Sequence, residues 1–174
     1  LAGYRTILRP PVCAPYRNYS VCGMGPPSSG ALTVGQILAL VERFDLPRLG
    51  PSPQSIHLIL EASRLAFADR ARYMADIDFV PVPVVGLLDS GYLSERSRMI
   101  HVDSSIGKAS AGIPPGVLSA NATVYQSEPA GTSHLSIVDA LGNIVSMTTT
   151  IESGFGSRLM TDGFLLNNEL TDFS

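Results

Sequence analysis

The sequence changes character abruptly at Gly131, and this change constrains the fold more than any other feature. Before Gly131, apolar residues recur at the spacing of helices, whereas after it apolar and polar residues alternate as they do in strands. Helices are predicted over residues 33–46, 53–74 and 90–100. Strands are predicted over residues 132–139 and 144–151, which form a hairpin, and over 164–166. Because helices precede strands, the predicted fold class is α+β.

Local signals set the expected boundaries of the first two helices. Thr33 is predicted to be an N-cap, and Gln36 three residues later completes a capping box. Pro47 ends that helix, and the second helix starts near Pro53. Residues 1–30 are expected to be irregular apart from a short strand over 19–22.

An uncharged stretch separates the helical part from the strands. Residues 104–130 combine Ser, Gly, Ala and Pro with almost no charge. Such a composition offers little apolar surface for packing, so a mobile linker is predicted over about 104–131. The linker runs directly into the strand that opens with Thr132.

Composition excludes several classes of function. The chain has 174 residues with 12 Lys+Arg against 15 Asp+Glu, a net charge of −3, which argues against nucleic acid as a partner. No run approaches the roughly 18 apolar residues of a membrane helix. The three histidines and two cysteines lack the spacing of a zinc site.

For Cys13 and Cys22, a single disulfide bridge and two free thiols both fit the sequence. With Leu1 first and no visible targeting leader, the chain reads as a piece of something longer.

The junction at Thr132 is where chemistry is expected. A threonine hydroxyl becomes a useful nucleophile beside a base, and its own α-amino group is one such base if the chain is cut just before it. Gly131 suits a cut, because it leaves its carbonyl open and tolerates strained backbone. On spacing alone, an ordinary strand residue remains the alternative.

Two blocks of sequence, one on each side of this junction, resemble a known protein family. The downstream block comprises Gly131 to Asp139 (GTSHLSIVD), Gly142-Asn143, Thr148 to Thr150, Phe155-Gly156 and Leu166 to Ser174 (LNNELTDFS). The upstream block comprises Pro26 to Gly30 (PPSSG), Gln36 to Leu38 and Phe67 to Arg70 (FADR). Together they closely resemble the gamma-glutamyltransferase (gamma-glutamyltranspeptidase) family, at the junction between its large and small subunits.

The resemblance implies an N-terminal-nucleophile hydrolase with a four-layer αββα sandwich. Residues 1–131 would be the end of the large-subunit region and 132–174 the start of the small, catalytic one. A precursor would cut itself between Gly131 and Thr132, and the two subunits would remain partners. Thr132 would then take a γ-glutamyl group from glutathione-like amides and pass it to water or an amino acid. No metal or organic cofactor is implied.

The resemblance also implies roles for further residues, through their positions in the matching motifs. Thr150 matches a threonine that helps activate the nucleophile, and its alternative role is strand packing. Glu169 and Asp172 match residues that hold the substrate's α-ammonium group, which needs a paired carboxylate when partly buried. Glu152 stands where many members have Asn, so it would add a third carboxylate to that pocket. His134 and the Ser28-Ser29 pair are expected to serve structure, as a hydrogen-bonded strand residue and a rigid turn.

Two other functions remain open from the sequence. Glu152 also suits an acylase of the same fold with a non-glutamyl donor, and a truncated, non-catalytic homologue is the third possibility. The family's α-carboxylate ligands and oxyanion hole correspond to positions outside 1–174, so this piece alone is expected to be inactive. The resemblance implies a periplasmic or secreted location.

Overall fold

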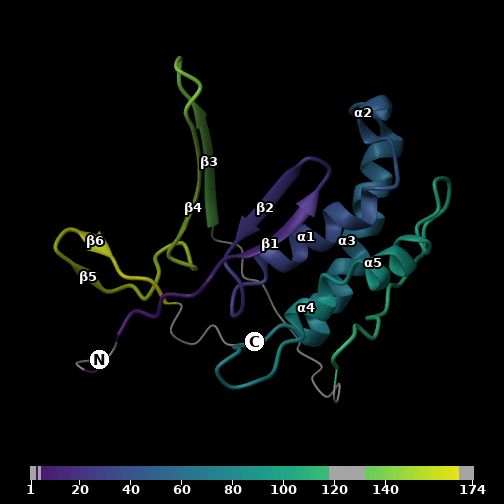
Figure 1. Cartoon of the computed structure of the whole chain (residues 1–174). Helices are drawn as coiled ribbons and strands as arrows, with labels where there is room; N and C mark the ends of the chain where they lie inside the picture. The colour runs from purple at the N-terminus through teal and green to yellow at the C-terminus, as the bar shows by residue number, and fades with distance from the viewer. Residues whose placement is uncertain (1–2, 4, 118–131, 169–174) are drawn as a thin grey trace. The chain divides into compact units, whose positions relative to one another are not determined.

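A computed structural model describes residues 3, 5–117 and 132–168 (Figure 1). They fall into two compact units, with residues up to 117 in the first and residues from 132 in the second. The first unit contains β1 (Val12–Tyr16), β2 (Tyr19–Gly23), α1 (Gly30–Val41), α2 (Leu46–Leu49), α3 (Pro53–Tyr73), α4 (Val84–Leu87) and α5 (Ser90–Ser97). The second contains β3 (Thr132–Val138), β4 (Ile144–Thr150), β5 (Met160–Thr161) and β6 (Phe164–Leu165). The predicted α+β class is confirmed.

The long helix α3 is the centre of the first unit, packed against α1 as Figure 1 shows. Its start at Pro53 is confirmed, because the Ser52 hydroxyl accepts a hydrogen bond from the Ser55 amide and caps the helix. Leu58 and Leu65 are completely buried on one face of α3 and pack in the main apolar cluster. None of the described helices is long and apolar enough to cross a membrane.

Helix α1 starts earlier than the sequence predicted. Ser29, rather than Thr33, occupies the N-cap position, and the Thr33 amide donates to the Ser29 carbonyl at 2.8 Å. The predicted capping box is therefore wrong. Gln36 is buried instead, and its amide donates to Asp69 and to the Leu87 carbonyl. A tertiary partner for Gln36 outweighed the local capping signal.

An N-terminal hairpin packs on α1. The predicted strand over 19–22 is present as β2, and β1, which was not predicted, pairs with it antiparallel. Cys13 and Cys22 face each other in that pairing and are joined by a disulfide, the first of the two alternatives. A Cβ on Gly35 would lie 2.7 Å from the Ala14 Cβ, so a glycine is needed where this hairpin meets α1.

Residues 105–117, which we call the strap, differ from the predicted mobile linker. The strap's apolar side chains join both apolar clusters of the first unit, and Pro114 is fully buried. At its start, the Ser105 hydroxyl and Ile106 amide donate to the buried carboxylate of Glu61 at 2.8 and 2.6 Å. Composition could not indicate these partners, because they lie on α3. Residues 118–131 of the predicted linker lie outside the described residues.

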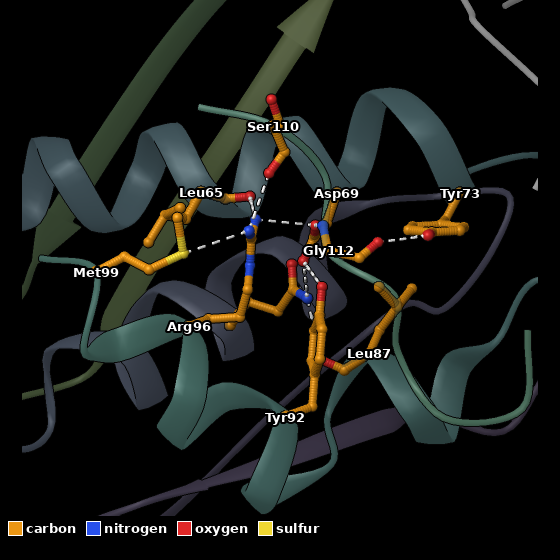
Figure 2. A network of polar contacts seen from close by, with 10 residues as sticks. Leu65, Asp69, Tyr73, Leu87, Tyr92, Arg96, Met99, Ser110 and Gly112 are labelled. Atoms are coloured by element: carbon orange, nitrogen blue, oxygen red, sulfur yellow. Dashed lines mark hydrogen bonds and ion pairs between the residues drawn. The ribbon is translucent and has the colours of Figure 1, made fainter. Parts of the chain in front are cut away.

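A second buried carboxylate, that of Asp69, holds α1, α5 and the strap together (Figure 2). One of its oxygens accepts from Gln36 and from the Tyr92 hydroxyl, at 3.1 and 2.7 Å. The other accepts from Arg96 at 3.0 Å and from the Gly112 amide at 2.9 Å. Burial, followed by the hydrogen bond to Asp69, raises the pKa of Tyr92 far above its usual value. Tyr92 therefore stays a neutral donor at any physiological pH.

Glu61 makes the stability of this unit depend on pH. Burial alone would raise its pKa, but hydrogen bonds from Ile106 and Ser105, aided by Arg64, leave the pKa below its ordinary value. The ionised form therefore stabilises the fold above the pKa of the unfolded chain, and this contribution is lost as pH falls through the folded pKa.

We predict that Glu61→Gln lowers the unfolding free energy by about 2 kcal/mol at pH 7 and by much less near pH 3, because charged hydrogen bonds are lost only where Glu61 is ionised. Urea unfolding of this chain at both pH values measures the difference. Glu95→Gln is the matched control, since Glu95 is exposed on α5. An equal loss at both pH values would contradict the prediction.

Candidate active site around Thr132

The hairpin of β3 and β4 places the predicted nucleophile. Its strands pair antiparallel with Thr132 opposite Thr150 and His134 opposite Thr148. The turn between them is fixed by Asp139, whose carboxylate accepts from the Leu141 and Asn143 amides, each at 2.8 Å. This register matters, since a slip by one residue would turn Thr132 to the opposite face of the hairpin.

Thr132 and Thr150 are thus direct cross-strand neighbours on one face. Cβ atoms of such pairs lie about 4.5–5.5 Å apart, within reach of a hydroxyl on either side. The Thr150 hydroxyl oxygen accepts a hydrogen bond from the Glu152 amide at 2.8 Å, which orients it. The hairpin therefore brings together the two threonines for which the family resemblance predicts a catalytic role.

His134 has partners of its own on the same face. Its Nδ1 lies 2.8 Å from the Thr148 hydroxyl, and its Nε2 lies 3.1 Å from the Ser146 hydroxyl. The prediction of a hydrogen-bonded strand residue is confirmed. The Ser28-Ser29 pair also serves structure, because it forms the turn into α1, with the Ser29 hydroxyl accepting from Arg70 at 2.8 Å.

Glu152 is held by Asn168, a residue 16 positions further along the chain. The Asn168 side-chain amide donates to the Glu152 carboxylate, and its oxygen accepts from the Ser153 amide at 3.1 Å. Glu152 itself adopts a positive φ of 68°, a backbone conformation that is uncommon for residues other than glycine. Asn168 immediately precedes Glu169 in the sequence. Nothing local in the sequence signals this pairing across 16 positions.

A compact loop over residues 156–166 brings Asn168 back to Glu152. The Ser157 amide donates to the Leu166 carbonyl, and the Leu166 amide donates to the Leu159 carbonyl, both at 2.9 Å. A Cβ on Gly156 would lie 2.0 Å from the Leu166 carbonyl oxygen, so only glycine fits at this crossing. The third predicted strand is present here as β6, which pairs with β5.

Gly131, Glu169 and Asp172 lie outside the described residues, so their assignments to the cleavage site and the ammonium pocket stay predictions. Within residues 3, 5–117 and 132–168, no group of three or more His, Cys, Asp or Glu side chains could hold a metal ion.

Comparison with known proteins decides the family. The gamma-glutamyltranspeptidase family profile matches residues 1–174, the full sequence. The chain belongs to the gamma-glutamyltranspeptidase family. It is 38% identical over 177 residues to a glutathione hydrolase proenzyme of Escherichia coli, and 38% identical over 176 residues to an acylase ACY 1 proenzyme of a Pseudomonas species. Those alignments cover 100% and 99% of this chain.

Solved structures agree with this membership. The gamma-glutamyltranspeptidase of Helicobacter pylori matches with a TM-score of 0.63 and 37% identity, over 69% of this chain and 35% of that one. The chain spans 29% of the length of both the hydrolase and the acylase relatives. Because those two match equally well, identity to relatives does not choose between a hydrolase and an acylase.

Proposed function

We propose that the complete protein is a self-cleaving gamma-glutamyltransferase and hydrolase whose nucleophile is Thr132. The observation that carries this proposal is the pairing of Thr132 with Thr150, at the first position of a strand in a member of this family. The family resemblance supplies the cleavage site, Gly131-Thr132. The full four-layer αββα sandwich is part of the same proposal.

Cleavage would proceed through an ester. The Thr132 hydroxyl attacks the Gly131 carbonyl, the peptide C–N bond breaks, and the proton of the hydroxyl ends on the nitrogen. Water then hydrolyses the ester, which leaves a carboxylate on Gly131 and a free α-amine and hydroxyl on Thr132. The hydroxyl of Thr150, which pairs with Thr132 across the hairpin, would hydrogen-bond the attacking oxygen during both this step and turnover.

Turnover reuses the same oxygen. The new α-amine accepts the proton of the Thr132 hydroxyl as that oxygen attacks the γ-carbonyl of a glutathione-like amide. The leaving amine takes the proton, and a γ-glutamyl ester forms on Thr132. Water resolves the ester in hydrolysis, and the amino group of an amino acid or peptide resolves it in transfer. None of these steps uses a metal or an organic cofactor.

Glu152, Glu169 and Asp172 would bind the substrate's α-ammonium group. Support comes from the contact between Glu152 and Asn168, because it brings the Glu152 carboxylate to the residue that precedes Glu169. A carboxylate held by an amide donor is oriented before the ligand arrives, which reduces the ordering that binding requires.

A periplasmic or secreted location belongs to the proposal as well. The disulfide between Cys13 and Cys22 supports it, because structural disulfides persist in oxidising compartments and are rare in the cytosol.

An acylase with a non-glutamyl donor is the second candidate. Glu152 favours it, since this carboxylate stands where many family members have Asn, and the Pseudomonas acylase matches this chain as well as the glutathione hydrolase does. The two candidates share the nucleophile and the cleavage. They differ in whether the α-ammonium group of the donor is recognised.

We predict that the complete wild-type protein gains a new N-terminus at Thr132, whereas Thr132→Ala stays uncut because it has no attacking oxygen. Thr132→Ser, which keeps the hydroxyl, should still cleave. Intact mass and N-terminal sequencing after long incubation measure this. An uncut wild type would leave the third candidate, a homologue without the chemistry.

We also predict that Glu152→Gln lowers the preference for a γ-glutamyl amide over its des-amino counterpart, the glutaryl amide, by about tenfold, through a higher KM for the γ-glutamyl donor. A charge-assisted hydrogen bond to the ammonium group is worth about that factor. Steady-state kinetics on both amides provide the ratio.

Asp162→Asn removes a charge from the β5–β6 turn and serves as the control for this experiment. A wild type that prefers the glutaryl amide would favour the acylase. An unchanged ratio in Glu152→Gln would remove Glu152 from the pocket.

A further inference from the structure

The side chain of Asn168 joins two neighbouring points of the segment that follows β4. Its amide nitrogen donates a hydrogen bond to the Glu152 carboxylate, and its amide oxygen accepts one from the Ser153 backbone amide at 3.1 Å. A primary amide suits this place, because it carries a donor and an acceptor on one planar group. Asn168 therefore holds a side chain and the backbone of that segment at the same time.

The backbone of Glu152 needs such support. Its φ of 68° lies in the left-handed region, and a residue other than glycine persists there only where its surroundings hold it. The Glu152 amide donates to the Thr150 hydroxyl at 2.8 Å, which is a local bond across two residues. Asn168 adds support from 16 positions away. The placement of the Glu152 side chain thus depends on Asn168.

The Glu152 carboxylate keeps capacity for a ligand in this arrangement. An ionised carboxylate has about four acceptor sites, so one donor from Asn168 leaves room for an ammonium group. Glu152 and Asn168 are both partly buried, and charges in such surroundings are screened less than charges at the open surface. This carboxylate can therefore bind an ammonium group more strongly than a fully exposed one could.

We propose that Asn168 is a positioning residue for donor selectivity: it holds Glu152 where this carboxylate meets the α-ammonium group of the donor. Asn168 makes no contact with the donor in this role. It acts by keeping Glu152 in one conformation, so that binding has one side chain fewer to order. This inference rests on the proposed function, because it adds Asn168 to the proposed ammonium pocket.

The test compares Asn168→Ala, Glu152→Gln and the variant that carries both, each in the complete protein. Steady-state kinetics give the ratio of kcat/KM for a γ-glutamyl amide to that for the glutaryl amide, which lacks the α-ammonium group. The cost of ordering one freed side chain predicts that Asn168→Ala lowers this ratio by roughly two- to tenfold, through a higher KM for the γ-glutamyl amide. Turnover of the glutaryl amide should stay close to wild type.

The double variant separates positioning from a direct role. If Asn168 acts through Glu152, its removal changes nothing further once the Glu152 carboxylate is gone, so the double variant should have the same ratio as Glu152→Gln. Independent roles would instead multiply the two losses. Asn168→Gln is the conservative variant, since it keeps a donor and an acceptor on a side chain one methylene longer. It should recover part of the ratio that Asn168→Ala loses, and it provides the same comparison if Asn168→Ala does not fold.

Asn143→Ala is the matched control. It removes an amide of the same size that also donates to a carboxylate, that of Asp139, at 2.7 Å. Asn143 lies in the turn at the opposite end of the hairpin from Thr132 and Thr150. The donor ratio of this variant should equal that of wild type, whatever the change costs in stability.

Each outcome has a distinct meaning. An uncut wild type, or one that prefers the glutaryl amide, overturns the proposed γ-glutamyl activity and this inference with it. A wild type that prefers the γ-glutamyl amide, together with losses that multiply in the double variant, overturns the positioning role alone. An unchanged ratio in Asn168→Ala does the same. Equal losses on both amides also overturn it, because they would assign Asn168 to folding alone.

Discussion

The buried carboxylate of Asp69 is the interaction on which the first unit depends. An ionised acid in a protein interior is tolerated only when donors surround it. Here they come from three directions: Gln36 on α1, Tyr92 and Arg96 on α5, and the Gly112 amide of the strap. The Asp69 carboxylate on α3 therefore connects α1, α5 and the strap, which are distant in sequence. These hydrogen bonds define how the three elements are arranged around α3.

The arrangement of β3 and β4 in the second unit depends on the pairing register of the two strands and not on the burial of their side chains. The described side chains of β3 and β4 are all exposed, so no core selects their alignment. The Asp139 turn and the cross-strand contact between His134 and Thr148 set it. Thr132 and Thr150 face each other as a consequence of that register. His134 thus contributes to the register of the hairpin through its contact with Thr148.

Sequence reasoning succeeded where the deciding interactions are local. The start of α3 follows from the capping residue Ser52 before Pro53, and the β3–β4 hairpin follows from alternation around a turn. It failed where a distant partner decides. Gln36 looked like half of a capping box because Asp69 lies 33 positions away. The strap looked unpacked because its anchors are on α3, and Asn168 gave no sign of its contact with Glu152.

The exposure of the β3–β4 hairpin bears on the proposed catalysis. Ile137 and Val145 pair on its apolar face and are 56% and 51% exposed. A two-stranded ribbon is marginally stable in water, so Thr132 and Thr150 hold their geometry only if that face is covered. This chain spans 29% of the length of its hydrolase relative. We therefore expect the proposed activity only from a complete protein in which that face of the hairpin is covered.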